Sequence, residues 1–371
     1  MKHTVSGSYY LICRFLIFLL IASSGCKKTS DPPGSKLYFP PKDSQSWESI
    51  TPASLGWSSD GLERLLTFLS DNNTRAFIIL KNGRIIIEEY RGNNILNTAP
   101  FTSSSIWYWA SAGKALTAFL AGLAQQEGLL SINDKTSDYL GSGWTSLPAE
   151  KEDMITLRHQ LTMTTGLDYN VSDTDCSSPS CLLYKADAGT QWFYHNAPYT
   201  LLENVISNAF GGSYNNYTDT RLESKTGMSG TWIKTGDYNN IYYSTARDAA
   251  RFGLLILNYG KWGDDPILTD EGYFDAMVNT SQSLNLSYGF LWWLNGKSSI
   301  IYPGLATTLN VSLSPAAPDD MIAAMGKNGQ FINIIPSLGM VVVRMGEAPG
   351  TNLVPVTFHN EMWQKIMQMI N

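Results

Sequence analysis

The chain is poor in the residue types that bind metals or form dense positive patches. Its 371 residues include only four Cys and four His, and 26 Lys and Arg stand against 32 Asp and Glu, for a formal net charge of −6. There is no dense run of Lys or Arg, which argues against a nucleic-acid partner because a phosphate backbone binds a basic face. No His, Cys or carboxylate spacing predicts a metal site, and we expect no cofactor.

The first residues predict export and not a membrane span. The apolar run over 15–22 is shorter than the ~20 residues of a spanning helix and fits a signal-peptide core. We expect a signal peptide over 1–25, a lipid on Cys26 and a tether over 26–46. The mature protein would then lie in the cell envelope of a Gram-negative bacterium, held to the membrane by its lipid anchor only. Ser23 departs from the usual aliphatic residue of such sites, and an uncleaved or merely secreted protein is the alternative.

Two cysteines remain beyond this N-terminal segment. Cys176 and Cys181 flank Ser177-Ser178-Pro179-Ser180, a turn-rich stretch. Proteins of oxidising compartments use such spacings for short-loop disulfides, and we predict one here. A metal-binding pair is the alternative, but no His or second Cys pair accompanies these residues.

Hydrophobic periodicity predicts strands near both ends of the chain. Apolar residues at helical spacing indicate a helix over 59–70. The runs 76–80 and 85–90 flank Asn82-Gly83, the strongest short signal for a β-hairpin. A second hairpin is predicted over 331–343, and the chain ends with the pattern of a helix.

The middle of the chain has the pattern of helices and loops. Thr156 and Thr245 each stand directly before a helical pattern, and we predict that they cap these helices. Strands at both ends predict an α/β (α+β) fold, in which an antiparallel sheet flanked by helices is built from both chain ends and carries an inserted all-α domain. We place the folded domain at 47–371, with an α/β part at 47–110 and 282–371 and a mainly helical part at 111–281.

Ser111-Ala112-Gly113-Lys114 carries the pattern S-x-x-K just before an apolar helical face. Positions three apart share a helix face, so the Lys114 amine can reach the Ser111 hydroxyl. A serine hydroxyl is a weak nucleophile until a neighbour takes its proton, and a buried Lys whose pKa is lowered from about 10.4 can do so. The pattern alone carries little weight, because Ser24 and Lys27 have the same spacing.

The triplet Tyr194-His195-Asn196 offers a phenol as a second proton carrier. A Tyr beside a protonated Lys can be held as phenolate, or can share a proton with Ser111 and Lys114, and so act as base in acylation and as acid toward the leaving group. Two further Y-x-N triplets begin at Tyr214 and Tyr238. We favour Tyr194 because it lies beside an apolar helical run, whereas the other two lie in sequence typical of loops.

Acyl transfer also needs backbone N–H groups that stabilise the developing oxyanion. Two K-T-G triplets, at Lys225 and Lys234, are interpreted as loop because neither adjoins a strand pattern. The segment 324–330, Ala-Met-Gly-Lys-Asn-Gly-Gln, leads directly into the last hairpin, and its glycines allow close backbone approach. We expect the Lys327 N–H to pair with that of Ser111 in this role.

In combination these motifs resemble a known family. Ser111-x-x-Lys114, Tyr194-x-Asn196 and Gly326-Lys327-Asn328-Gly329-Gln330 before a terminal hairpin resemble the β-lactamase-related serine hydrolases, in the class C β-lactamase and DD-peptidase branch. The runs 155–167 and 244–253 are similar to further blocks of that family. The Gly-x-x-Gly-Gln form resembles 6-aminohexanoate-dimer hydrolases and esterase-like members more than true β-lactamases.

The resemblance implies a β-lactamase/transpeptidase-like fold and a serine acyl hydrolase that forms an acyl-enzyme on a small ester or linear amide. Its candidate substrate-binding residues are Asn196, Gly326, Tyr169 and His195. Ala324 stands where a β-lactamase or peptidase has Lys or His to bind a substrate carboxylate, which argues against β-lactams and D-Ala-D-Ala as substrates. We expect a monomer whose only partner, apart from the membrane at its anchor, is the small-molecule substrate.

Two other functions are open at this point. A Ser-His-Asp hydrolase is disfavoured because the chain has no G-x-S-x-G elbow and, beyond the signal segment, only His159, His195 and His359. We interpret His159 as a core histidine with a satisfied ring. A non-catalytic envelope lipoprotein that retains the fold as a binder or scaffold is the main alternative, because a fold does not guarantee activity.

Overall fold

The computed structural model describes residues 37–352 and 354–371. The predicted signal peptide, the lipid site at Cys26 and the tether as far as residue 36 lie outside the described residues. Among the described residues, no helix has the length and apolar character that a bilayer crossing requires.

A six-stranded antiparallel sheet contains strands from both ends of the chain, in the order β2-β1-β11-β10-β9-β8. The two ends meet where β1 pairs with β11, with Ile78 opposite Val343. This confirms the predicted sheet. Its strands are β1 (Thr74–Lys81), β2 (Arg84–Tyr90), β8 (Trp293–Leu294), β9 (Ile322–Gly326), β10 (Gln330–Ile335) and β11 (Met340–Gly346).

Turn residues fix the register of the two predicted hairpins. Asn82 and Gly83 both have positive φ, 47° and 82°, as a two-residue turn between β1 and β2 requires. A side chain at position 83 would also meet the Tyr38 carbonyl oxygen at 1.9 Å, so only glycine fits. Between β10 and β11, a short 3-10 turn η6 (Pro336–Leu338) ends at Gly339, whose φ is 55°.

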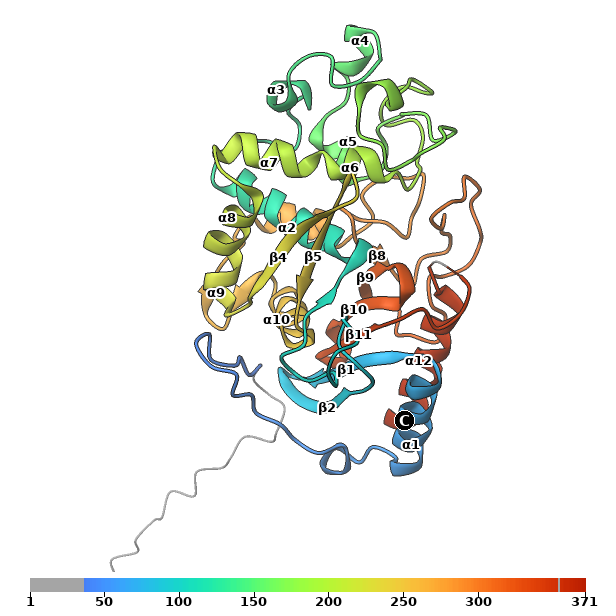
Figure 1. The fold of residues 1–371 in the computed structure, drawn as a ribbon. Coiled ribbons are helices and arrows are strands. Elements are labelled where there is room, and N and C mark those ends of the chain that lie inside the picture. The colour runs from blue at the N-terminus through green and yellow to red at the C-terminus, as the bar shows by residue number, and fades with distance from the viewer. Residues whose placement is uncertain (1–36, 353) are drawn as a thin grey trace, which may run out of the picture. The chain divides into compact units, whose positions relative to one another are not determined.

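Helices cover both faces of this sheet (Figure 1). The C-terminal helix α12 (Val356–Ile370) packs on α1 (Ser59–Asp71) and meets one face of β10, where Phe358 stacks on Phe331. Helix α10 (Ala246–Leu257) lies against the opposite face, because a side chain at Gly253 would touch Ile332, the neighbour of Phe331 along β10. The predicted capping residues Thr156 and Thr245 each accept a backbone N–H at a helix start, and Ser58 does so at the start of α1.

The part between the two sheet halves is mainly helical but not wholly so. A second sheet, in the order β3-β5-β4, lies within it. The expectation of an all-α insert missed this sheet because the residues that join β4 to β5 have a loop composition. The elements of this part and its borders are β3 (Trp107–Tyr108), η2 (Ala110–Ala112), α2 (Gly113–Gln126), α3 (Ser137–Leu140), α4 (Ala149–Glu152), α5 (Leu157–Leu161), η3 (Pro179–Cys181), α6 (Asn196–Thr200), α7 (Leu202–Phe210), α8 (Tyr214–Thr218), η4 (Asp219–Glu223), α9 (Ser224–Thr226), β4 (Gly230–Thr235), β5 (Asn239–Ser244), β6 (Lys261–Trp262), β7 (Asp265–Pro266) and α11 (Glu271–Met277). Two short 3-10 turns lie outside it, η1 (Pro52–Leu55) before α1 and η5 (Lys327–Gly329) between β9 and β10.

The last residues of the expected tether lie on the folded body. Arg251 donates to the carbonyl oxygens of Pro41 at 2.9 Å and Ser44 at 3.1 Å. The ring of Phe39 packs edge-on against Trp262, with 5.1 Å between centroids. The segment 37–46 is therefore a strap across the body, and the prediction of a free tether to residue 46 was wrong for this part. The Pro and Ser residues of this segment do not predict that the buried Arg251 guanidinium binds its carbonyl oxygens.

A buried acid lies behind the second sheet. Glu223, in the short π-helix η4, accepts a hydrogen bond from the Tyr242 hydroxyl at 2.6 Å. Burial raises the pKa of Glu223 to about 7, because the charged form loses its hydration. Since the folded-state value lies above the ordinary 4.5, the folded protein binds this proton more tightly than the unfolded chain does. Binding of this proton contributes fully to the free energy of unfolding below pH 4.5, and the contribution is lost as the pH rises through about 7.

We predict that Glu223→Gln makes the protein more stable than wild type at pH 8 by about 2 kcal/mol, with little difference at pH 5. The neutral amide keeps an acceptor for Tyr242 and never has to ionise. Thermal or urea unfolding at several pH values measures the difference, and Glu63→Gln, on the exposed side of α1, is the matched control. A Glu223→Gln advantage that does not grow with pH would contradict the assignment.

Candidate active site

Ser111 lies in a sharp turn at the start of a buried helix. Ala110, just before it, has a φ of 48°, a left-handed conformation that is unfavourable for a residue with a Cβ and that recurs at functional sites. The chain then enters α2, and the Lys114 Nζ lies 3.0 Å from the Ser111 Oγ. The S-x-x-K pattern is thus brought together by one helical turn.

The Lys114 amine is held in an apolar and aromatic environment. The side chain is buried, and its Nζ lies 4.2 Å from the ring centroid of Tyr199 and 5.0 Å from that of Tyr194. Burial lowers the pKa of Lys114 to about 7, against a smaller raising effect of the Asp175 charge. A substantial share of the amine is therefore neutral near pH 7 and able to accept a proton.

Tyr194 converges on the same hydroxyl from another segment. It precedes α6, and its phenol lies near enough to Ser111 for the serine to lower the pKa of the phenol. The ring stacks on Trp293, with 5.8 Å between centroids, and meets the edge of Tyr288 at 6.3 Å. Burial raises the pKa of Tyr194, although the interaction with Ser111 acts in the opposite direction. The phenol is therefore protonated at neutral pH, which leaves proton sharing and disfavours the phenolate hypothesis.

The end of β9 lies directly against the nucleophile turn. A side chain at Gly326 would meet the Trp109 carbonyl oxygen at 2.5 Å and the Ala112 nitrogen at 3.0 Å. The peptide of Lys327 follows at once, at the start of η5, while the Lys327 side chain is exposed. The backbone, and not the ammonium, is the part of Lys327 that the fold brings toward Ser111.

Arg344, which was not among the predicted site residues, supports this end of β9. Its side chain is completely buried in β11 and donates to the carbonyl oxygens of Asn328 at 2.6 Å and Gly329 at 3.1 Å. The Asn328 amide donates in turn to the Tyr108 hydroxyl at 2.8 Å. Burial lowers the pKa of Arg344 to about 9. A lone Arg within an otherwise apolar strand was the available signal, since such a cation must find buried acceptors.

The remaining candidate residues lie around a loop closed by the Cys176–Cys181 disulfide, whose Cα atoms are 5.9 Å apart. The Asn196 amide does not contact Ser111 and donates to Asp175 at 2.6 Å. His195 is buried, and burial lowers its pKa to about 4, so the ring is neutral.

Tyr169 makes its ring contacts with residues other than the three converging side chains. Its ring stacks on Phe193 with 3.9 Å between centroids, and the Lys185 ammonium lies 4.4 Å from the Tyr169 centroid. Neither Tyr169 nor His195 has a contact with Ser111 in the described part of the chain. Their assignment to substrate binding remains a prediction.

The assignment of the K-T-G triplets and of Tyr214 to loops was wrong. Lys234 and Thr235 end strand β4, and Thr226 lies in helix α9, so neither K-T-G triplet is simply loop. Tyr214 begins helix α8 and donates its hydroxyl to Thr117 at 2.9 Å. None of these residues adjoins β9 in the sheet that carries Gly326.

A family model described as Beta-lactamase matches residues 71–354, a range that includes all three converging side chains and the end of β9. The chain belongs to the beta-lactamase family. Members of this family are serine hydrolases that act on esters and amides.

Individual relatives of the beta-lactamase family support the same fold. An uncharacterised protein of Alkalihalophilus pseudofirmus is 24% identical over 308 residues, which cover 74% of this chain and 84% of that protein. A putative 6-aminohexanoate-dimer hydrolase from Bacillus anthracis superposes with a TM-score of 0.65 at 18% identity, over 89% of each chain. A putative beta-lactamase from Bacteroides dorei gives 0.65 at 18% identity, over 85% of this chain and 99% of that one.

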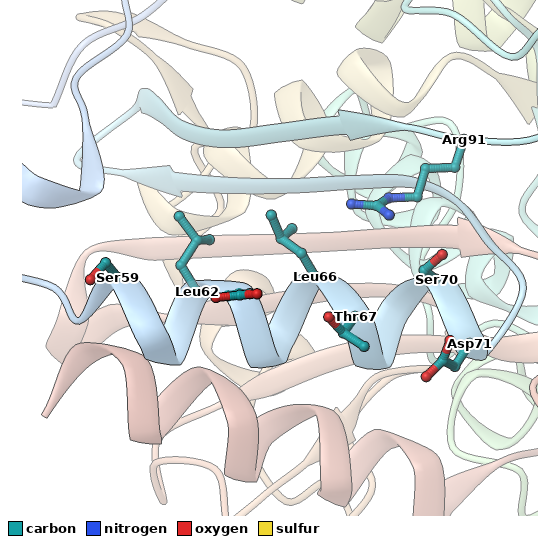
Figure 2. A pocket seen from close by; sticks show the side chains of 8 residues that line it. Ser59, Leu62, Leu66, Thr67, Ser70, Asp71 and Arg91 are labelled. Atoms are coloured by element: carbon teal, nitrogen blue, oxygen red, sulfur yellow. The ribbon is translucent and has the colours of Figure 1, made fainter.

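Two features of the described residues beyond the converging side chains bear on other kinds of site. No group of three or more His, Cys, Asp or Glu among the described residues could hold a metal ion. A hollow of about 430 Å³ runs along α1, where Leu62 and Leu66 form its floor and Arg91 reaches over it (Figure 2). It contains none of the residues that converge on Ser111.

We predict that Gly326→Ala lowers kcat by about 100-fold or more, because the added Cβ must push β9 away from the nucleophile turn and so displace one oxyanion donor of this beta-lactamase-family site. Ester hydrolysis by the purified variant measures the effect. Gly350→Ala is the control, since a Cβ there meets nothing within 4 Å. Unchanged kcat in a folded Gly326→Ala variant would show that β9 does not take part.

Proposed function

We propose that the protein is a serine acyl hydrolase that cleaves small esters or linear amides through an acyl-enzyme on Ser111. The observation that carries the proposal is the convergence of three groups. The Lys114 amine lies 3.0 Å from the Ser111 Oγ, and the Tyr194 phenol lies near enough to the same serine to interact with it. The beta-lactamase family membership agrees with this chemistry.

In acylation, the neutral Lys114 amine takes the Ser111 proton as the Oγ attacks the substrate carbonyl carbon. The new C–O bond makes a tetrahedral oxyanion, which the N–H groups of Ser111 and Lys327 stabilise. The bond to the leaving oxygen or nitrogen then breaks. Tyr194 passes its proton to the leaving group and regains one from the Lys114 ammonium, so that the amine is neutral again.

In deacylation, water attacks the acyl carbonyl carbon and gives its proton to the neutral Lys114. The ester bond to Ser111 breaks, and the serine oxygen recovers that proton from the ammonium. The acid product leaves, and the enzyme returns to its first state. An amine of pKa about 7 can accept a proton in the first half of each step and donate it in the second half. The burial of Lys114 matters because it lowers the pKa of the amine to this value.

The same features favour a substrate without a carboxylate at the reacting end. Ala324 is buried in β9 and carries no charge, where a cation would bind such a group. A true β-lactamase or DD-peptidase is therefore the less favoured reading. We place the mature protein in the cell envelope as a monomer, with Cys26 as the lipid site, and the N-terminal sequence pattern supports this placement.

A fluorophosphonate probe tests the proposed function. It should label wild type and leave Ser111→Ala unlabelled, because only an activated serine reacts. Hydrolysis of a p-nitrophenyl ester should fall by about 1,000-fold or more in the same variant. Ser103→Ala, at an exposed serine upstream, is the control. Equal labelling of both proteins, or no labelling of either, would favour a non-catalytic binding protein.

The pH profile tests Lys114 as the base. We predict that kcat/KM for a neutral ester rises with pH through an apparent pKa near 7, the value to which burial lowers that of Lys114. The value of kcat/KM rises with pH because only the deprotonated Lys114 amine accepts the serine proton. Lys114→Met should abolish the activity, whereas Lys261→Met, at an exposed position, should keep the profile. A profile that is flat between pH 5.5 and 8.5 would exclude this role.

A further inference from the structure

The charge that Lys114 gains in the proposed reaction is not balanced by an ion pair in the described part of the chain. When the Ser111 proton passes to the Lys114 nitrogen, a buried amine becomes a buried ammonium, which is costly unless another group stabilises it. The charge of Asp175 acts on this amine, but the Asp175 carboxylate binds two amides, those of Asn196 at 2.6 Å and Asn239 at 3.0 Å.

The ring of Tyr199, in α6, lies closer to the Lys114 amine than the ring of Tyr194 does. The distance from the Lys114 nitrogen to the ring centroid is 4.2 Å for Tyr199 and 5.0 Å for Tyr194. An aromatic face attracts a cation within about 6 Å, and the attraction is stronger where water is excluded. Lys114 and Tyr199 are both buried. Since Tyr194 carries a proton in the proposed reaction, Tyr199 is the ring whose contribution to Lys114 is the contact alone.

Helix α2 holds the Tyr199 ring in this position. The Tyr199 hydroxyl lies 3.4 Å from the hydroxyl oxygen of Thr117, which follows Lys114 by three residues and so shares its helix face. Tyr214 also donates to the Thr117 hydroxyl, at 2.9 Å. The hydroxyl of Tyr199 is thus tied to the same helix that carries the base, and the ring face keeps a fixed distance from the amine.

The other titratable groups near this contact do not compete with it at neutral pH. The groups that act on the amine or on the Tyr199 phenol are Tyr194, Tyr214, Tyr288, Asp175 and Glu203. Burial raises the pKa of the Tyr199, Tyr214 and Tyr288 phenols, so all three are neutral near pH 7. Tyr199 therefore acts on the amine through a neutral ring face and not as a phenolate.

We propose that Tyr199 is a positioning residue for the catalytic base: its ring face holds the Lys114 amine toward Ser111 and stabilises the ammonium that forms when this amine takes the serine proton. The inference rests on the proposed hydrolase function and adds a residue to its mechanism. The proton moves from the Ser111 oxygen to the Lys114 nitrogen and back, and the ring exchanges none. A carboxylate in contact would keep the lysine protonated at neutral pH, whereas a neutral ring stabilises the ammonium more weakly and leaves the amine able to act as a base.

Fluorination of the ring at position 199 tests the proposal with little change in side-chain size. Phenylalanine, 4-fluorophenylalanine and 3,4,5-trifluorophenylalanine are placed there, because fluorine draws electrons from the ring face and weakens its attraction for a cation. NMR of carbon-13-labelled lysine follows the titration, and Lys114→Met identifies the signal. We expect Tyr199→Phe to titrate close to wild type. The trifluoro ring should lower the pKa of Lys114 by about 0.5 to 1.5, and the monofluoro ring should give an intermediate value.

The same variants are assayed on a p-nitrophenyl ester. The rise of kcat/KM with pH should move to lower pH together with the Lys114 titration. The plateau at high pH should fall by about 2- to 10-fold, because a weaker base takes the serine proton less readily. The trifluoro ring at position 119 is the matched control. Phe119 lies in α2 and packs edge-on against Phe252, so this change should leave both measurements as in wild type.

Each outcome separates the contact from the reaction. If esters are hydrolysed through Ser111 but the pKa of Lys114 does not follow the number of fluorine atoms, the inference is overturned and the hydrolase function stands. A rise in that pKa would also overturn it, because Tyr199 would then only exclude water. Absence of Ser111-dependent hydrolysis in wild type would overturn the proposed function and the role of Tyr199 with it. If the trifluoro variant does not fold, the monofluoro variant gives the same comparison with Tyr199→Phe.

Discussion

The burial of one amine is the constraint on which the rest of the site depends. In water an ammonium of ordinary pKa holds its proton at neutral pH and cannot act as a base. The pKa of Lys114 is lowered because the start of α2 places the amine among the rings of Tyr194 and Tyr199, where it loses its hydration. The fold must therefore supply enough apolar packing around α2 to compensate for a poorly solvated polar group. Almost every residue of that helix is buried, as this requirement demands.

The position of the nucleophile depends on long-range contacts that tie two distant parts of the chain together. The turn at Ala110 lies against the end of β9, and only glycine at position 326 leaves room for the approach. Arg344 stabilises the turn that follows β9, because its guanidinium donates to the carbonyl oxygens of Asn328 and Gly329. A guanidinium suits this role because its planar fork can satisfy several acceptors at once without a neighbouring carboxylate. The site is thus rigid on the side where charge develops during acyl transfer.

Local patterns predicted the parts of the site that local geometry determines. The spacing of Ser111 and Lys114 fixed their contact through the helical repeat, and the Asn82-Gly83 turn fixed the first hairpin. The hairpin of β4 and β5 was missed because its strands carry few apolar residues on an exposed face and its turn reads as loop. Asp175 and Arg344 were missed for a different reason. Their partners lie in segments far away in the sequence, and no periodicity within one segment records such contacts.

The distribution of charge around Ser111 follows from these non-local contacts and bears on the kind of substrate. The strand beside the nucleophile, β9, carries the buried Ala324 and no charged residue that could bind a carboxylate. On the opposite side, Asp175 contributes a negative charge that acts on Lys114, Tyr194 and His195. An anionic substrate would thus meet no cation at position 324 and a repulsive charge at Asp175. Because charge pairs interact strongly in a partly buried site, this arrangement supports the proposed preference for substrates without a carboxylate.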